Sequence, residues 1–500
     1  MRMSNNYYIG VDFGTQGVRC GIVDAKGWVL ITNEVAYSTQ YPAPGWAAQD
    51  PAEWLKCFDE AMRQCLMEAD QHIINNIKGL SLCTTASTVL PVDKDGNHLY
   101  HALLWMDNRA KEEAAFINKQ KHQVLKYCGG EVSVEWAMPK MLWLKKNKPD
   151  IYNSMYRFVE MLDFMNHYLT GEWCSSICQA TCKANYVKDY GEWVEDYYES
   201  IGLDSGKLCK RVMKLGEPVG RIRKDLAERY SLPSGLTVYQ GGTDAHVAML
   251  GLGIYKPGGM SVVMGTSFVH LAFAEKPVFL NGIWGPYNDP VVPGLFCFEG
   301  GQVSAGSITK WFLREFGITG ENGYSEMTKE AQSIQPGSDG VITLDYFQGN
   351  RTPYKDPKAK GVFYGLTLSH TKAHIYRSIL ESVAFGTKNI IDTITQADLN
   401  IESIVASGGV IKNPLWMKII SDVTQKPILL TKNSTNAGIL GCAVLSAIGS
   451  GEYGGFKEAI ENMVEISATI EPDLSEYQKY EENYINYLKI YQQLKPIMNS

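Results

Sequence analysis

Hydrophobic and polar residues near the start of the chain follow the pattern of short strands separated by tight turns. The run YYIGVDFGTQGVRCGIVDAKGWVL at residues 7–30 has apolar segments on both sides of the glycine turn 14–17 and of DAKG at 24–27. Short apolar runs bounded by Gly and Asp turn residues are typical of β-hairpins. The pattern therefore predicts three consecutive strands.

A second unit of this kind occurs at residues 260–273, MSVVMGTSFVHLAF. A β-branched run enters a Gly-Thr turn, and a second apolar strand leaves it. The two units lie in different halves of the chain. This arrangement indicates two related domains, although one shared hairpin is a short repeat.

Helical spacing of apolar residues marks three longer segments: 50–69, 374–394 and 436–451. In the first of these, Asp50 is placed to cap the helix, with Pro51 at its first position and Glu53 at its third. These residue types favour a helix start. The last segment, NAGILGCAVLSAIGSG, is rich in small residues, so we expect it to pack closely against another element.

The alternation of strands and helices predicts an α/β protein. With 500 residues, the chain is too long for one ordinary core, which favours two domains. We place the change of domain in the segment 245–260, around GLGIYKPGG, which divides the chain into residues 1–248 and 249–500.

Composition narrows the range of partners and compartments. Hydrophobic residues make up 45% of the chain and charged residues 20%, as in ordinary globular proteins. The net charge of −7 and the pI of about 5.8 argue against nucleic acid or an anionic membrane as the main partner. No run of 18 apolar residues occurs, and the N-terminus shows no signal-peptide pattern.

The 11 cysteines follow no CxxC pattern, which predicts reduced thiols and a cytoplasmic protein. Three of them, Cys174, Cys178 and Cys182, recur at intervals of four. This spacing differs from that of iron–sulfur proteins, and no fourth ligand is nearby, so we interpret them as buried structural residues.

The stretch VDFGTQGVR at 11–19 contains groups that suit a phosphate. Its glycines let backbone N–H groups approach an anion, Thr15 adds a hydroxyl, and Arg19 adds a positive charge. An ordinary hairpin turn is the alternative. The pattern is neither a Walker A loop nor a dinucleotide-binding fingerprint.

Three further glycine turns could carry chemistry. MGTS at 264–267 repeats the Gly-Thr set, and ASGGV at 406–410 ends a predicted strand. GGTDA at 241–245 holds Asp244, either as a general base or as a helix cap. His246 is interpreted as a packing residue, because no other histidine lies at ligand spacing.

Taken together and in this order, DxGT, GxxDA, GTS and GG resemble the FGGY family of carbohydrate kinases. The stretch GVFYGLTLSHTKAHIYRSILE at 361–381 is similar to a signature of that family. PKMLWLKKN at 139–147 fits an earlier signature only in part: Lys140, Trp143 and Leu144 agree, while Glu135 and Ala137 depart. The resemblance implies two ribonuclease H-like domains of the actin, hexokinase and Hsp70 superfold, flanking a catalytic cleft.

The resemblance also implies an ATP-dependent sugar kinase, with Asp244 as the catalytic base. Mg²⁺ is expected near Asp12 and Asp244. ATP is expected mainly against the C-terminal domain and the sugar mainly against the N-terminal one. The residues implied to contact the nucleotide and its phosphates are Asp12, Gly14, Thr15, Arg19, Gly265, Thr266, Gly306, Lys310, Gly408, Gly409 and Asn413.

On the sugar side, the chain looks most like the ribulokinase-type branch of the family. This likeness implies that Lys183, Glu299 and Asp244 contact the sugar and that Ala86 and Ser87 close its site, with a surface ion pair as the alternative for Lys183 and Glu299. Trp105, Asp107 and Arg109 are further candidates for the wall of the site.

The expected substrate is a ketopentose such as ribulose, with xylulose as the alternative, whereas the glycerol kinase pattern is absent. A sugar or nucleotide sensor without catalysis and an actin-like or Hsp70-like ATPase are the rival functions. The expected partner is a small-molecule sugar, with neither nucleic acid nor membrane, and a homodimeric assembly is left open.

Overall fold

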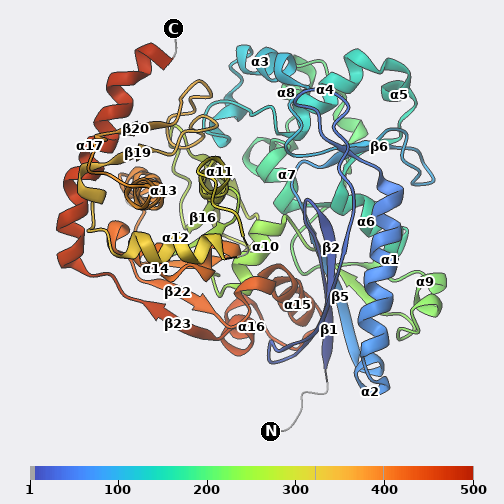
Figure 1. Cartoon of the computed structure of the whole chain (residues 1–500). Helices are drawn as coiled ribbons and strands as arrows, with labels where there is room; N and C mark the ends of the chain where they lie inside the picture. Colours follow the sequence, from blue (N-terminus) through green and yellow to red (C-terminus); the bar gives the residue numbers. More distant parts are fainter. Residues whose placement is uncertain (1–5, 321, 398, 499–500) are drawn as a thin grey trace.

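The computed structural model describes residues 6–320, 322–397 and 399–498. Residues 1–5, part of the segment inspected for a signal peptide, lie outside the described residues. Figure 1 shows two α/β halves side by side, with the N-terminal half on the right and the C-terminal half on the left. The predicted fold class is confirmed.

The sheet of the N-terminal half has six strands in the order β13-β14-β5-β1-β2-β3. The three strands predicted at the start of the chain pair antiparallel, β5 and β14 continue the sheet in parallel with β1, and β13 pairs antiparallel with β14 at the edge. The strands are β1 (Tyr7–Phe13), β2 (Gly17–Asp24), β3 (Val29–Ala36), β5 (Ile77–Thr84), β13 (Pro218–Arg221) and β14 (Thr237–Tyr239).

The sheet of the C-terminal half has seven strands in the order β17-β18-β16-β15-β21-β22-β23. Six of them, β18, β16, β15, β21, β22 and β23, have the same order and directions as β3, β2, β1, β5, β14 and β13 of the first sheet. The repeated hairpin in the sequence therefore belongs to two sheets of the same topology. The strands are β15 (Gly259–Met264), β16 (Phe268–Ala274), β17 (Trp284–Asn288), β18 (Phe296–Gln302), β21 (Ser403–Ser407), β22 (Ile428–Thr431) and β23 (Ile466–Ile470).

Helix α1 (Pro51–Glu68) covers β2 and β3 on the outer side of the first sheet. Asp50 caps it as predicted, because its carboxylate accepts a hydrogen bond from the backbone N–H of Ala52 at 3.0 Å. Glu53 does not complete a capping box. Its carboxylate instead accepts hydrogen bonds from the backbone N–H and the hydroxyl of Ser38.

Two helices, α10 (Asp244–Gly251) and α15 (Ala437–Gly449), lie between the two sheets (Figure 1). Helix α15 comes from the C-terminal half but packs on β1 and β5 of the first sheet, and it also packs against α10. The small residues allow this close approach: a Cβ at Gly441 would collide with the carbonyl oxygen of Val247. The close packing predicted for this helix is confirmed.

The two halves share part of their hydrophobic core, because one core cluster includes Tyr8, Leu271 and Leu440. The boundary expected between residues 248 and 249 lies inside α10. The chain passes into the second sheet only after this helix ends at Gly251. The division into two domains at that point stays a prediction.

The N-terminal half contains further elements, most of which lie between β5 and β14 along the chain. Its remaining helices are α2 (Gln71–Asn75), α3 (Lys111–Lys119), α4 (Ala137–Asn147), α5 (Pro149–Ser154), α6 (Met161–Thr170), α7 (Ile177–Lys183), α8 (Glu195–Ser200) and α9 (Lys224–Arg229). A four-stranded sheet joins β4 (Ala48–Gln49), β7 (Ala102–Leu103), β6 (Val89–Val92) and β8 (Arg157–Glu160). Two short pairs are β9 (Ser175–Ser176) with β12 (Val212–Met213), and β10 (Tyr186–Val187) with β11 (Glu192–Trp193).

In the C-terminal half, the predicted helix 374–394 extends slightly further, as α13 (Lys372–Thr395), and packs against α14 (Pro414–Thr424). The last helix, α17 (Leu474–Met498), forms the outer edge of the molecule (Figure 1). The other elements are α11 (Gly306–Glu315), α12 (Gly323–Gln332), α16 (Phe456–Met463), β19 (Ile342–Leu344) and β20 (Val362–Tyr364).

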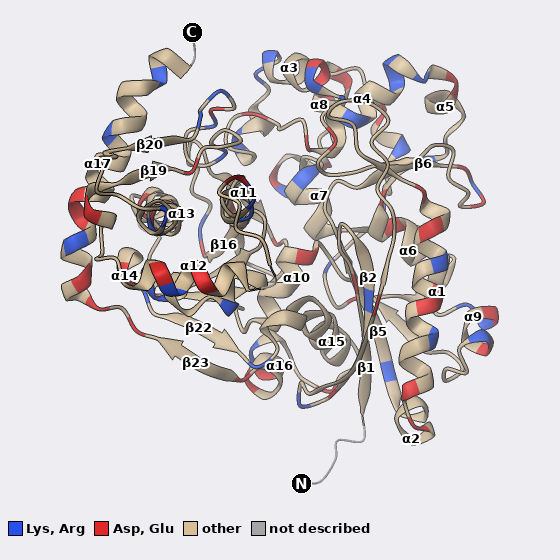
Figure 2. Cartoon of the chain, viewed as in Figure 1, with Lys and Arg blue, Asp and Glu red and all other residues tan. Residues whose placement is uncertain are grey.

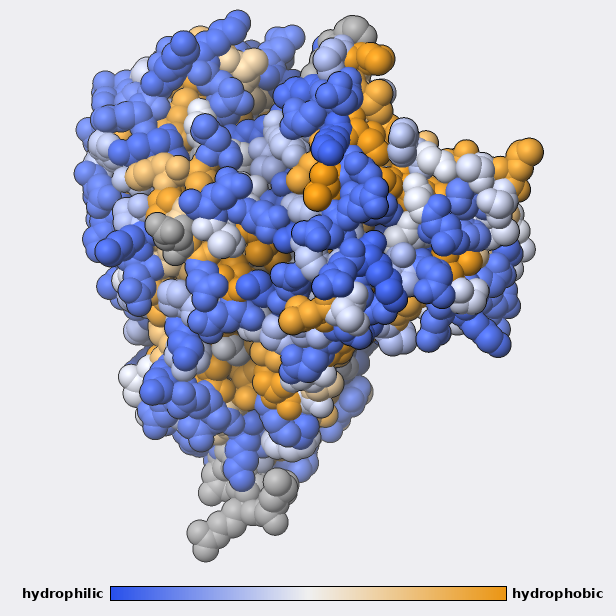
Figure 3. Space-filling model, turned by 90° about the vertical axis from the view of Figure 1, so that its left-hand side faces the viewer, coloured by the Kyte–Doolittle hydropathy of each residue, from blue (hydrophilic) through white to orange (hydrophobic). Residues whose placement is uncertain are grey.

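The surface shows the mixed charge that the composition indicated. Figure 2 shows acidic and basic residues interspersed along α1, α9 and α17. On the face shown in Figure 3, hydrophobic areas are separated by hydrophilic residues. Within the described part of the chain, no helix is both long and apolar enough to cross a membrane. All 11 cysteines are buried and free, as expected from their lack of pattern.

Candidate active site

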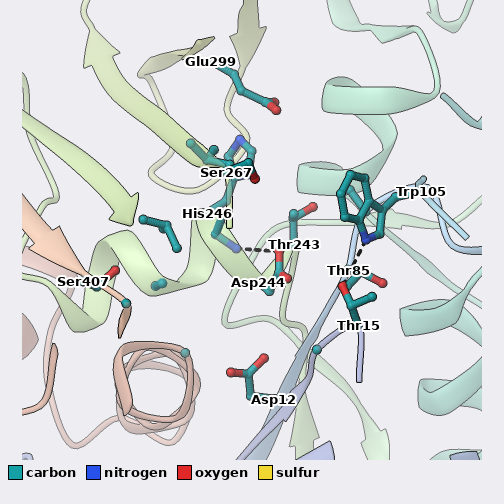
Figure 4. A pocket seen from close by; sticks show the side chains of 18 of the residues that line it. Asp12, Thr15, Thr85, Trp105, Thr243, Asp244, His246, Ser267, Glu299 and Ser407 are labelled. Atoms are coloured by element: carbon teal, nitrogen blue, oxygen red, sulfur yellow. Dashed lines mark hydrogen bonds between the residues drawn. The ribbon is translucent and has the colours of Figure 1, made fainter. Parts of the chain in front are cut away.

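A cleft of about 350 Å³ lies between the two halves, and both contribute to its walls. It holds many of the residues that the sequence singled out, and Figure 4 shows part of its lining. The predicted residues that line it are Asp12, Gly14, Thr15, Ala86, Ser87, Trp105, Lys183, Asp244, Glu299 and Gly408.

Asp244 is the first residue of α10 and faces the cleft (Figure 4). The glycine turn before it is pressed against β5: a Cβ at Gly241 would collide with the Leu82 carbonyl oxygen. The Gly242 carbonyl oxygen accepts a hydrogen bond from the N–H of Thr84 at 3.1 Å. These contacts fix the start of the helix, so the carboxyl group is held in place by the sheet.

The surroundings of Asp244 suit a group that exchanges a proton near neutral pH. Burial, and secondarily the charge of Asp12, raise the pKa of Asp244 to about 7. Burial also raises the pKa of Asp12, although Arg19 opposes this. Asp12 and Asp244 face the same cleft, and burial disfavours the ionised form of each. Such a pair of oxygen donors fits a divalent cation such as Mg²⁺.

The first predicted phosphate turn is held on several sides. Gly14 donates its N–H to the Gly17 carbonyl oxygen at 2.9 Å, and Trp105 donates its indole N–H to the Thr15 hydroxyl at 3.1 Å. Arg19 forms an ion pair with Glu34 at 2.6 Å and donates to the Thr435 carbonyl oxygen at 3.2 Å. Arg19 therefore reaches from the first sheet to the segment before α15.

The second Gly-Thr turn and the Gly-Gly turn meet at the end of β15. Gly265 donates its N–H to the Ser267 carbonyl oxygen, and Gly306 donates to the Gly265 carbonyl oxygen, both at 3.1 Å. A Cβ at Gly306 would collide with that same oxygen. Gly408 has a φ of 92° and lies against the backbone of Met264, where a Cβ would not fit. Thr266 lines the mouth of the cleft.

Five residues implied to contact the nucleotide lie outside the described lining of the cleft: Gly265, Gly306, Lys310, Gly409 and Asn413. Lys310 is exposed on α11. Asn413 caps α14 by accepting a hydrogen bond from the N–H of Trp416 at 3.1 Å, and it donates to the Thr328 hydroxyl at 3.0 Å. Their contact with a nucleotide stays a prediction.

At the other end of the cleft, Lys183 and Glu299 form an ion pair. The Lys183 ammonium donates to both carboxylate oxygens of Glu299, at 2.8 and 2.7 Å, and lies 3.8 Å from the centre of the Trp284 ring. The side chains are only 9% and 10% exposed, so the alternative of a surface ion pair is wrong. Burial opposes ionisation of Glu299, but Lys183 holds its pKa below the usual value.

The loop at Ala86 and Ser87 closes the same end of the cleft, as the sequence implied for its position. Ser87 has a φ of 53°, which is uncommon for a residue with a side chain. Its hydroxyl oxygen is buried and has no hydrogen-bond partner among the described residues. The loop therefore offers an unused polar group beside the cleft.

Two candidates for the wall, Asp107 and Arg109, are wrong. They form an ion pair at 2.8 Å in which the side chains are 0% and 1% exposed. Arg109 lies 4.0 Å from the centre of the Trp46 ring, and Asp107 accepts a hydrogen bond from the N–H of Ala47 at 2.6 Å. The pair therefore joins its own loop to the loop that contains Trp46 and Ala47. Neither side chain lines the cleft. Of the three candidates for the wall, only Trp105 lines it.

His246 is buried, in agreement with a packing residue. Its Nε2 atom lies 3.4 Å from the sulfur of Cys182, and burial lowers its pKa to about 4. The potential ligand atoms of Cys178, Cys182 and His246 lie within 4.8 Å of one another. Sequence spacing could not show this, because it depends on the placement of α7 relative to α10.

Several side chains of the cleft were missed by sequence reasoning, among them Glu135, Trp284 and Arg351. Arg351 forms an ion pair with Glu135 at 2.6 Å, and its guanidinium carbon lies 5.3 Å from the centre of the Trp284 ring. None belongs to a glycine turn. The departure of Glu135 from the first family signature was the one signal that marked this position.

Comparisons with known proteins agree with this geometry. Residues 7–251 match the N-terminal domain of the FGGY family of carbohydrate kinases, and residues 260–450 match its C-terminal domain. An FGGY carbohydrate kinase domain-containing protein of Xenopus laevis is 31% identical over 97% of this chain and 96% of its own length.

A ribulokinase of Geobacillus thermodenitrificans is 30% identical over 98% of this chain and 94% of its own length. The solved structure of a xylulose kinase from Rhodospirillum rubrum superposes with a TM-score of 0.91, covering 99% of this chain and 100% of that one. Its sequence identity of 24% shows a shared fold.

Proposed function

The chain belongs to the FGGY family of carbohydrate kinases and is a phosphotransferase that uses ATP and a sugar hydroxyl, and we propose that its substrate is a ketopentose such as ribulose. One observation carries the assignment of the site. The partly buried carboxyl group of Asp244 lies in a cleft that has glycine turns at one end and the Lys183–Glu299 pair at the other.

In this proposal, Asp244 takes the proton of the attacking sugar hydroxyl, which a carboxylate with a pKa near neutrality can do. Lys183 and Glu299 hold the sugar hydroxyls, with the loop at Ala86 and Ser87 and the ring of Trp105 as the wall. Charged groups form strong and directional hydrogen bonds, which suits recognition of a polyhydroxylated substrate.

The nucleotide lies against the glycine turns. The turn containing Gly14 and Thr15 faces the phosphates from the first sheet, and Gly265 and Thr266 face them from the second. Gly306, Gly408 and Gly409 line the nucleoside, with Lys310 and Asn413 at its outer side. Asp12 and Asp244 would hold Mg²⁺, which neutralises phosphate charge during phosphoryl transfer when it is bound.

We place this reaction in the cytoplasm, which the 11 free and buried cysteines support. A homodimer remains a prediction that light scattering of the purified chain would check.

An ADP-release assay across ribulose, xylulose, hexuloses and polyols tests the substrate. We expect the highest kcat/KM with ribulose, and a preference for xylulose would transfer the proposal to the second ketopentose. Absence of stimulation by any ketose would overturn the substrate class. ADP release that is independent of sugar would favour an ATPase.

A further inference from the structure

Lys140 is a fully buried lysine that the proposed reaction does not use. It lies on α4 and belongs to the part of the first family signature that the chain retains. Its side chain is 0% exposed. Burying an ammonium group is costly unless hydrogen bonds replace its lost hydration, so its surroundings should account for it.

The ammonium group donates to three backbone carbonyl oxygens from three separate segments. The distances are 2.7 Å to Ser87, 2.6 Å to Leu104 and 2.8 Å to Glu135. An ammonium group has three N–H donors, so each is used. Burial lowers the pKa of Lys140 to about 7, but only the charged form can make all three bonds.

Each of the three segments contributes to the sugar end of the cleft. Ser87 lies in the loop that closes the cleft, with the unusual φ of 53°. Leu104 directly precedes Trp105, whose ring lines the cleft. Glu135 lines the cleft and pairs with Arg351 of the C-terminal half. The three segments lie after β5, after β7 and before α4, so sheet pairing alone does not fix their relative positions.

We infer that Lys140 is a positioning residue for sugar recognition, which joins the Ser87 loop, the Trp105 segment and the Glu135–Arg351 contact into one unit. Removal of the ammonium would leave three carbonyl oxygens without this donor and release the segments from one another. The inference rests on the proposed sugar site, since it gives Lys140 a role only if that end of the cleft holds the sugar.

The test compares Lys140→Met with Lys145→Met. Methionine keeps most of the apolar stem and removes the donors. Lys145 lies on the same helix and also donates to a backbone carbonyl, that of Gly202, but it is exposed. Initial rates with ribulose and ATP give both KM values and kcat, and the melting temperature reports folding.

We expect Lys140→Met to raise the KM for ribulose about tenfold or more, with the KM for ATP changed less than about twofold, as expected for a loss confined to one substrate. Lys145→Met should leave both KM values unchanged. A purely structural role would lower the active fraction, and hence kcat, while both KM values stayed the same. That result would overturn the inference.

A second variant covers the case in which Lys140→Met does not fold. Lys140→Arg keeps the charge, but its planar guanidinium cannot reproduce three donors on one nitrogen, so we expect a smaller increase in the same KM. An unchanged KM in folded Lys140→Arg, with unfolded Lys140→Met, would assign Lys140 to folding alone.

Trp105→Leu separates this inference from the proposed site. If Trp105→Leu raises the KM for ribulose and the Lys140 variants do not, the positioning role fails and the site stands. If none of these variants changes that KM, the proposed location of the sugar fails, and the inference fails with it.

Discussion

The proposed reaction depends on the carboxyl group of Asp244. Asp244 is the first residue of a helix, and it lies in a cleft that also contains Asp12. Burial and this neighbouring charge both disfavour its ionised form and raise its pKa to about 7. A general base with a pKa near the operating pH combines a useful ionised fraction with sufficient basicity.

The pH dependence follows from this value. Below its pKa, Asp244 is protonated and cannot accept a proton, so kcat/KM for ribulose should rise with pH up to about 7 and level off above it. Initial rates between pH 5.5 and 8.5 would show this. A flat profile over the same range would contradict the assigned role, after a stability control at each pH.

Some side chains of the site could be predicted from the sequence and others could not. Asp244 and Thr15 belong to glycine turns whose order along the chain identified the family. Asp107 and Arg109 are close in sequence to Trp105, but they pair with each other and turn toward Trp46. Their orientation depends on packing with residues far along the chain, which the local pattern does not contain.

At the scale of elements, the helices α10 and α15 connect the site to the core. Helix α10 presents Asp244, and α15 packs against both α10 and the strand β1 that ends beside the first glycine turn. The small residues of α15 predicted close packing. That α15 packs against α10 could not be predicted, because the two helices are about 190 residues apart in the chain and a local sequence pattern does not report such distant contacts.

The close contact between the helices can be tested with Gly441→Ala. The added Cβ would collide with the Val247 carbonyl oxygen, so the helices must separate. Overpacking of this kind typically costs about 1–3 kcal/mol. We expect a lower melting temperature and, because α10 carries Asp244, a lower kcat in the folded fraction.

The matched control for this prediction is Gly455→Ala, at a glycine where an added Cβ has nothing within 4 Å. Thermal denaturation and steady-state kinetics of both variants provide the comparison. Equal melting temperatures for the two variants would mean that the helices tolerate a wider spacing than the structure indicates.

At the scale of the molecule, two sheets with the same strand order enclose one cleft. The sequence repeat indicated this duplication, and the resemblance gave the fold. Lys183 with Glu299, and Glu135 with Arg351, each join a residue of the N-terminal half to one of the C-terminal half. Of these two contacts across the cleft, the sequence suggested the first only as a surface ion pair and did not suggest the second. They lie at the proposed sugar end of the cleft, where closure would exclude water from the reacting groups.

Arg351→Met tests the role of these contacts in closure. Without the Glu135 partner, the cleft should close less completely, so water should compete with the sugar for the phosphoryl group. We expect the ratio of sugar phosphate formed to ADP released to fall below that of the wild type. The measurement quantifies both products in the same reaction.

The control is Lys188→Met, which removes an ion pair at 3.6 Å between the exposed Lys188 and the buried Asp289 that also joins the two halves. It should leave the product ratio unchanged. If Arg351→Met also keeps the wild-type ratio, the Glu135–Arg351 contact has no part in excluding water.

The most direct test of the account is the kinetics of Asp244→Asn, which keeps the shape of the side chain and removes its basicity. We predict that kcat with ribulose and ATP falls by about 100-fold or more, while the KM for ribulose changes only a few-fold. Turnover at the wild-type rate in this variant would contradict the assignment of Asp244 as the base of a sugar kinase.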